Sequence, residues 1–102
     1  MELLIEPLAL KEIAEAAKWY SDKSSTAVEN FQAEITETFL YLQHTIAEHR
    51  KVYADIRVFF LKIFPYNIYQ VKREAENKIF ILAIMHNNRG NEFIKSRLKN
   101  IQ

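Results

Sequence analysis

The apolar positions in the first part of the chain recur at helical spacing. Pro7 suits the first turn of a helix, because that position needs no backbone N–H. The pattern predicts an amphipathic helix from Pro7 through Tyr20, preceded by a short strand at residues 3–5. The apolar stripe of this helix consists of Ala9, Ile13, Ala16, Ala17 and Tyr20.

A second helical pattern follows the polar break at residues 24–26. Thr26 and Glu29 have capping-box spacing, in which each side chain bonds a free backbone N–H at a helix start. We expect the two helices to form a hairpin whose apolar stripes need a sheet to cover them. The second stripe consists of Val28, Phe31, Ile35, Phe39, Leu42 and Ile46.

From Val52 onward, β-branched and aromatic residues replace the helical pattern. Short connections between the predicted strands favour antiparallel pairing, since a parallel crossover needs about a dozen residues. The order is β-α-α-β-β-β, an α+β fold in which a two-helix hairpin packs on a small antiparallel sheet. The last three strands are predicted at residues 56–64, 66–73 and 79–85.

These strands lack the alternation expected of a sheet that is covered on one face only. Apart from Arg57 and Lys62, both faces of the predicted strand at 56–64 are apolar, and residues 79–85 are apolar throughout. Residues 92–100 can form a last, basic helix. Either that helix covers the second face, or the face stays partly open for a protein partner.

Length and composition narrow the class of protein. The chain has 102 residues, 49% of them hydrophobic, so a single domain over residues 1–102 can bury a core. The absence of cysteine excludes disulfides, thiolate metal sites and cysteine nucleophiles. The N-terminus does not resemble a secretory signal, and no stretch approaches the roughly 18 apolar residues of a membrane span. We therefore expect a soluble, cytoplasmic protein that does not contact a membrane.

The two halves of the chain carry opposite charges. Residues 1–48 contain three basic and nine acidic side chains, a net charge of −6. Residues 49–102 contain eleven basic and four acidic side chains, a net charge of +7. Such asymmetry indicates that one part meets a polyanion or an acidic partner, although chance segregation of solvated charges would give the same counts.

The three histidines do not indicate a metal site. His44 and His49 are five positions apart, which differs from the four-residue spacing that aligns two ligands on a helix. Without cysteine, His86 has no thiolate to share a metal with. We expect neither a metal nor a cofactor.

Three short segments in the second half of the chain resemble those of a known protein family in their order and spacing. They are Asp55-Ile56-Arg57, then Phe64-Pro65-Tyr66-Asn67-Ile68-Tyr69, then Ile81-Leu82-Ala83-Ile84-Met85-His86 with Arg89. The helical half agrees at Ala9, Ile13, Glu15-Ala16, Trp19-Tyr20, Ala27 and Phe31. Over almost the whole chain the sequence resembles the RelE/ParE toxins of type II toxin–antitoxin systems, and ParE-like members more than RelE-like ones. The family fold is the hairpin on an antiparallel sheet that the periodicity predicts independently.

The resemblance implies a growth-inhibiting toxin of the plasmid-stabilisation type. Such a toxin is held inactive by a cognate antitoxin, which we expect to be acidic and partly disordered. ParE-like members poison DNA gyrase, whereas RelE-like members cut mRNA in the ribosome. The residues expected to contact the antitoxin or the target are Arg57, Lys62, Tyr66, Tyr69, Arg73, His86, Arg89 and Arg97.

The residues that RNA cleavage requires help to distinguish a RelE-like activity from a ParE-like one. Metal-free cleavage needs an acid, a base and cations for the phosphate, and the candidates here are His86, Arg57 and Arg89. RelE-like nucleases carry arginines where this chain has Asn67 and Asn88, and they end with a catalytic tyrosine. No tyrosine follows position 69 in this chain. These departures favour a ParE-like inhibitor that is not an enzyme.

Two alternatives stay open. One is a RelE-like, metal-independent endoribonuclease, and the other is an inactive family member that only binds proteins. The candidate residues also have ordinary structural roles. His86 can be a surface histidine at a strand end, Arg57 can pair with a carboxylate, and Tyr66 and Tyr69 can pack with their hydroxyls at the edge of the core.

Overall fold

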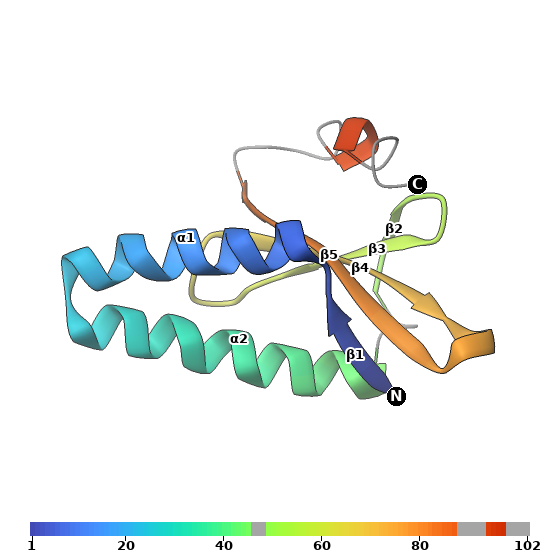
Figure 1. Ribbon diagram of the computed structural model, residues 1–102, viewed down its shortest axis with the longest axis horizontal. Coiled ribbons are helices and arrows are strands. Elements are labelled where there is room, and N and C mark those ends of the chain that lie inside the picture. Colours follow the sequence, from blue (N-terminus) through green and yellow to red (C-terminus); the bar gives the residue numbers. More distant parts are fainter. Residues whose placement is uncertain (46–48, 88–93, 98–102) are drawn as a thin grey trace.

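The computed structural model describes residues 1–45, 49–87 and 94–97 (Figure 1). A 3₁₀ turn, η2 (Glu74–Glu76), joins the last two strands, and residues 94–97 form a C-terminal helical turn. The order confirms the predicted α+β fold and adds one short strand, β2, before the predicted second strand. The elements are β1 (Glu2–Ile5), α1 (Pro7–Lys23), α2 (Ser25–Thr45), β2 (Lys51–Tyr53), β3 (Ile56–Phe60), β4 (Tyr66–Arg73) and β5 (Lys78–His86).

The strands form one sheet in the order β1-β5-β4-β3-β2. The pairs β2–β3, β3–β4 and β4–β5 are antiparallel, as their short connections predict. β1 lies parallel to β5, with Leu3 opposite Ile79. A parallel pair is compatible with the same rule, because both helices and three strands separate β1 from β5 along the chain.

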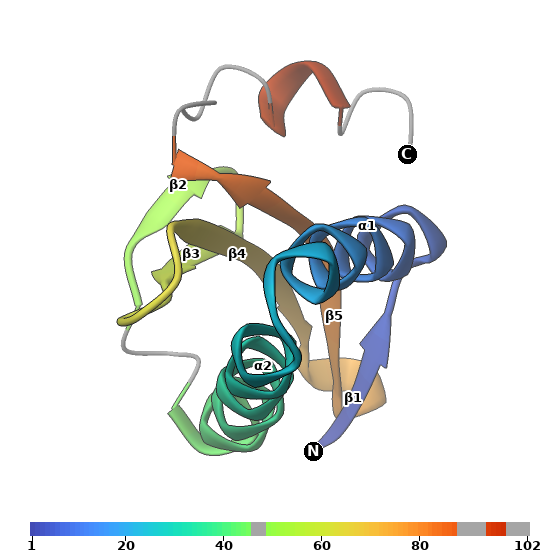
Figure 2. The ribbon, with the colours of Figure 1, turned by 90° about the vertical axis from the view of Figure 1, so that its left-hand side faces the viewer.

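Both helices pack on one face of the sheet, where they bury the main core (Figure 2). Phe31 of α2 lies at the centre of this core and is 0% exposed. Its ring stacks on Tyr20 of α1 at 5.2 Å and meets Phe64 edge-on at 5.4 Å. The aromatic contacts tie the helical hairpin to the segment that enters β4. The other buried members include Ala9, Ile35, Leu42, Ile68, Ile79, Ile81 and Ile84.

Ser24, rather than Thr26, joins the two helices. Its backbone N–H donates to the Tyr20 carbonyl at 3.0 Å, which closes α1. Its hydroxyl accepts a hydrogen bond from the Ala27 N–H at 2.9 Å, which caps the start of α2. The capping box predicted at Thr26 and Glu29 is therefore wrong. Three successive hydroxyl residues can each cap a helix, so the sequence does not distinguish among them.

The second face of the sheet is covered in part by the C-terminal turn. Ile94 of that turn is 0% exposed and belongs to a second apolar cluster. A bulge assists the burial, because Tyr69 pairs with Ala83 and Gln70 pairs with Ile81, which leaves Leu82 as an extra residue on β5. Of the two alternatives for this face, the structure shows cover by the C-terminal segment. The remaining buried members of the cluster are Ile56, Val58, Tyr69, Val71, Leu82, Ala83 and Met85.

The strand predicted at residues 56–64 is shorter than expected. β3 ends at Phe60, and residues 61–65 form a loop that returns to β4. The backbone N–H groups of this loop bond the Glu34 carboxylate of α2 instead of a neighbouring strand. The apolar composition of the segment does not reveal a partner that lies 28 to 30 residues earlier.

Replacing Phe31 with alanine is expected to lower the free energy of unfolding by roughly 3–5 kcal/mol, because the ring is fully buried and its cavity cannot refill. Leu40→Ala in the same helix is the control, since Leu40 is 58% exposed. Its expected change is within about 0.5 kcal/mol. Chemical denaturation measures both variants, and similar losses would contradict this placement of the core.

Candidate functional site

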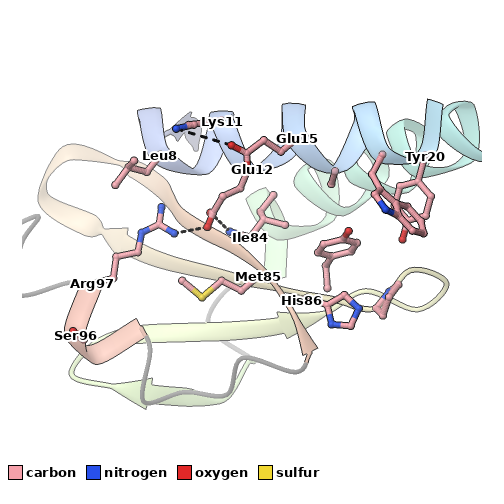
Figure 3. A pocket seen from close by; sticks show the side chains of 14 residues that line it. Leu8, Lys11, Glu12, Glu15, Tyr20, Ile84, Met85, His86, Ser96 and Arg97 are labelled. Carbon is pink, nitrogen blue, oxygen red and sulfur yellow. Dashed lines mark hydrogen bonds and ion pairs between the residues drawn. The ribbon is translucent and has the colours of Figure 1, made fainter. Parts of the chain in front are cut away.

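An open groove of about 810 Å³ lies between α1, the end of β5 and the C-terminal turn (Figure 3). One wall comes from α1, and the other comes from the strands and the turn. Both halves of the chain contribute, so the acidic half is not excluded from the site. The lining residues are Leu8, Lys11, Glu12, Glu15, Ala16, Trp19, Tyr20, Pro65, Tyr66, Ile84, Met85, His86, Ser96 and Arg97.

The α1 wall follows from the spacing of its residues. Leu8, Glu12, Ala16 and Trp19 recur at intervals of three or four and therefore share one side of the helix. Ala16 is buried, but Leu8 and Trp19 are each about half exposed, at 50% and 55%. The fold thus leaves two large apolar side chains accessible along the groove, as is common in protein-binding surfaces.

The end of the groove near β4 is aromatic. The ring of Tyr66 meets the His86 ring edge-on at 5.6 Å and lies 6.3 Å from the Tyr20 ring. Trp19 contacts Tyr20 at 5.0 Å, and the Lys23 ammonium lies 4.6 Å from the Trp19 ring centroid. Burial, followed by the hydrogen bond and the charge interaction with Tyr20, raises the pKa of Tyr66 to about 12. The Tyr66 phenol is therefore uncharged at neutral pH and is not a base there.

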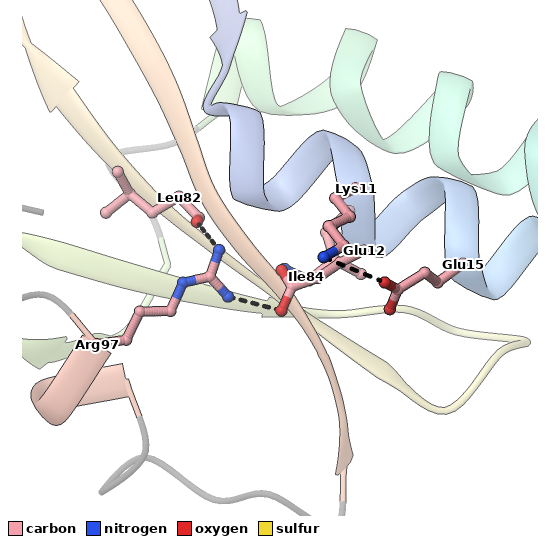
Figure 4. A network of polar contacts seen from close by, with 6 residues as sticks. All are labelled: Lys11, Glu12, Glu15, Leu82, Ile84 and Arg97. Carbon is pink, nitrogen blue, oxygen red and sulfur yellow. Dashed lines mark hydrogen bonds and ion pairs between the residues drawn. The ribbon is translucent and has the colours of Figure 1, made fainter. Parts of the chain in front are cut away.

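The other end of the groove contains a polar network that completes the edge of β5 (Figure 4). The last backbone bond from the β1 side joins the Glu6 N–H to the Ile81 carbonyl at 2.9 Å. From Leu82 onward, side chains rather than a neighbouring strand bond the backbone groups on this edge of β5. Glu12 Oε1 accepts from the Ile84 N–H at 2.8 Å, and Arg97 Nη2 donates to the Leu82 carbonyl at 3.0 Å.

Glu12 and Arg97 also bond each other. Arg97 Nη1 donates to Glu12 Oε2 at 2.6 Å, and the two side chains are 27% and 11% exposed for Glu12 and Arg97 respectively. A charge-assisted bond of this kind is stronger than the exposed pair formed by Lys11 and Glu15 at 4.0 Å. The Arg97 guanidinium is therefore engaged by the protein itself, and it anchors the C-terminal turn beside α1.

The structure brings three of the predicted contact residues together. Tyr66, His86 and Arg97 all line the groove. Lys62 lies exposed in the loop between β3 and β4, close in sequence to the lining residue Pro65. Arg89 lies outside the described residues.

The other three predicted residues lie away from the groove. Arg57 donates to the His49 carbonyl at 2.6 Å, beyond the end of α2. Tyr69 is fully buried on the second face of the sheet, and Arg73 ends β4 opposite Lys78. The predicted contact residues in the described part of the chain therefore lie at several places on the molecule rather than around the groove alone. Strand periodicity alone could not place them, because both faces of these strands are apolar.

The strand register also separates Arg57 from His86. Arg57 pairs with Gln70, and His86 pairs with Tyr66. The offset of four residues along β4, from Tyr66 to Gln70, corresponds to about 13 Å at roughly 3.3 Å per residue. Two of the three candidate cleavage residues, Arg57 and His86, are therefore separated along the sheet, and Arg57 does not line the groove that contains His86.

The sequence did not single out Glu12 or Trp19 as site residues. Glu12 reads as an ordinary solvated carboxylate, and Trp19 lies off the main apolar stripe. The sequence does contain a pattern that could have identified them. Leu8, Glu12 and Ala16 follow one another at four-residue intervals, which places them on a second side of α1. Within the described ranges, no group of three or more His, Asp or Glu residues could hold a metal ion, and no helix is long and apolar enough to span a membrane.

Known structures share this fold. The chromosomal ParDE toxin–antitoxin system from P. aeruginosa includes a chain with a TM-score of 0.72 and 19% identity, and the match covers 84% of this chain and 95% of that one. The E. coli RelBE complex gives 0.59 and 15% identity, over 83% and 94% of the two chains. Isolated E. coli RelE gives 0.59 and 15% identity, over 99% and 98%. No curated protein sequence matches the chain significantly.

The sequence identifies the family of this chain more specifically than the shared fold does. Residues 3–90 match the family described as the ParE toxin of the type II toxin–antitoxin system parDE. This range contains α1, α2 and the described strands except for Glu2, the first residue of β1, together with most of the groove. The chain belongs to the ParE toxin family of type II toxin–antitoxin systems.

Proposed function

We propose that this chain acts in the cytoplasm as a single-domain toxin that stabilises plasmids and arrests growth by binding DNA gyrase. Membership of the ParE family supports gyrase as the target class, since ParE-like toxins act on it. The observation that carries the proposal is the character of the groove. Its apolar and aromatic lining suits protein binding, while its arginine is already paired within the chain.

Cleavage of RNA has little support among the described residues. A cleavage site needs cations positioned where the phosphate gains charge, and losing one such stabiliser typically costs roughly 10²–10³-fold in rate. Arg97 is held by Glu12 and the Leu82 carbonyl, and Arg57 lies at a different place on the sheet. Tyr66, with a pKa of about 12, supplies no base at neutral pH. His86 would have to act without these partners.

We further propose that the groove receives a segment of the cognate antitoxin. Two similar structures are described as toxin–antitoxin systems or complexes, which supports a partner of that kind. A partly disordered, amphipathic segment can bury its apolar side against Leu8 and Trp19 while it orders on binding. Its acidic residues would then lie near the basic second half of the chain.

Trp19→Ala is expected to weaken binding of the antitoxin at least tenfold, because large aromatic anchors dominate interface energetics. Leu40→Ala should leave the affinity within about twofold, since Leu40 lies outside the groove. The association rate of the wild type should fall as salt rises, because steering between opposite charges is screened. Equal affinities for both variants, or a salt-independent rate, would argue against groove binding. Calorimetry and stopped-flow kinetics provide these values.

The target prediction is tested with the purified wild-type chain in two reactions. Supercoiling by gyrase should be inhibited, and mRNA ends from a translation reaction should show no toxin-dependent cuts. Addition of the antitoxin should restore supercoiling. Codon-phased cuts that vanish in His86→Ala would overturn the proposal and favour the ribonuclease alternative.

A further inference from the structure

The loop between β3 and β4, residues 61–65, is organised around one buried carboxylate. Glu34 of α2 is 9% exposed, and its oxygens accept hydrogen bonds from three consecutive backbone N–H groups. The bonds run from Lys62 at 2.8 Å, from Ile63 at 3.1 Å and from Phe64 at 3.1 Å (the loop is yellow in Figure 1). Burying a carboxyl group is unfavourable unless such donors surround it, so this loop conformation and the burial of the Glu34 side chain stabilise each other.

Both ends of the loop are fixed as well. The Leu61 N–H donates to the Tyr66 carbonyl at 3.0 Å, and the Leu61 side chain is buried. Phe64 packs edge-on against Tyr20 at 4.8 Å and against Phe31 at 5.4 Å. Contacts with α1 and α2 therefore fix the backbone of the loop on its side facing the helices, which restricts the conformations of its tip.

The tip of this fixed loop presents an aliphatic side chain to solvent. Ile63 is 75% exposed, more than any other exposed large hydrophobic residue of the described chain. Lys62 beside it is also exposed. The stretch from Ile56 to Arg73 contains four cations and no carboxylate, and Lys62 places one of these positive charges directly beside Ile63. Neither Lys62 nor Ile63 lines the groove.

We propose that Ile63 is an apolar anchor that inserts into a pocket of the toxin's protein target, with Lys62 facing an acidic rim of that pocket and Glu34 as the positioning residue. The proposal rests on the proposed function, because it assumes that growth arrest comes from binding a protein. A preformed loop loses little conformational entropy on binding, which favours affinity.

The shape of the tip favours a folded target over the antitoxin. A projecting side chain on a fixed loop is convex, so its complement is a concave pocket. A folded protein offers such a pocket before binding, whereas a partly disordered segment has none and instead fits a groove. The chain would therefore use separate surfaces, the loop tip for the target and the groove for the antitoxin.

The test compares full-length Ile63→Ser and Lys62→Glu with Leu40→Ser, a control that removes an exposed aliphatic residue away from the loop. Each variant is expressed at matched levels, and the surviving fraction of cells, the affinity for the antitoxin and the thermal unfolding midpoint are measured. Ile63→Ser and Lys62→Glu should raise survival at least tenfold, with antitoxin affinity within twofold and an unchanged midpoint. Leu40→Ser should arrest growth like the wild type.

Glu34→Gln tests the positioning role, with Glu37→Gln as the control because Glu37 is an exposed carboxylate of the same helix. Hydrogen exchange of the Lys62, Ile63 and Phe64 amides should become at least tenfold faster in Glu34→Gln alone, and growth arrest should weaken. A structural defect would instead accelerate exchange throughout the helices and the sheet. Unchanged exchange at the three amides would remove Glu34 from the proposal.

The outcomes separate this inference from the proposed function. Growth arrest by Ile63→Ser at wild-type strength would overturn the loop as a target contact, and so would a loss of antitoxin affinity equal to the loss of arrest. A wild-type chain that arrests growth without inhibiting gyrase would refute the gyrase proposal, yet the survival of Ile63→Ser would still decide the role of the loop. A wild-type chain that does not arrest growth would overturn both.

Discussion

The fold depends on the burial of β5, which is apolar on both faces and lies between β1 and β4. Seven consecutive apolar residues, from Ile79 to Met85, need cover on each side of the sheet. The helical hairpin covers one side, and Ile94 of the C-terminal turn covers part of the other. The edge of the strand has a separate requirement, because backbone N–H and carbonyl groups in a partly buried position need partners.

That second requirement produces the groove. β1 gives way to α1 at Pro7, so the last part of β5 pairs with β4 on one edge but has no described strand on the other edge. Glu12 bonds the Ile84 N–H and Arg97 bonds the Leu82 carbonyl there, so these two side chains connect α1 and the C-terminal turn to the strand. The space between these elements is the groove. The proposed site for a partner thus lies where the edge of the sheet is completed by side chains rather than by another strand.

Side-chain hydrogen bonds also replace strand pairing in the loop that follows β3. Glu34 satisfies three loop N–H groups that a longer strand would have paired, and the loop then carries Ile63 outward. Two glutamates that look alike in sequence, Glu12 and Glu34, therefore create two surfaces of opposite curvature. A concave surface suits a segment that orders on binding, and a convex one suits a folded protein. This division gives a physical basis for a toxin that meets an antitoxin and a target at different places.

The sequence predicted the helices, the three main strands and their antiparallel pairing, because each depends on local periodicity and connection length. It did not predict the cap at Ser24, since neighbouring hydroxyl residues are equivalent in that respect. The bulge at Leu82 escaped detection because a continuous apolar run has no alternation to interrupt. The roles of Glu12 and Glu34 depend on backbone groups at sequence separations of 72 and 28–30 residues, which no local pattern encodes.

The proposed binding of the antitoxin in the groove can be measured directly, because the chain contains its own fluorescent reporter. Trp19 is the only tryptophan in the sequence, and it lies half-exposed in the groove. Its fluorescence can be followed while a tryptophan-free antitoxin is added to the wild-type chain. Binding in the groove should shift the emission to shorter wavelength and protect Trp19 from acrylamide quenching at saturation. Unchanged emission and quenching in a fully formed complex would contradict it.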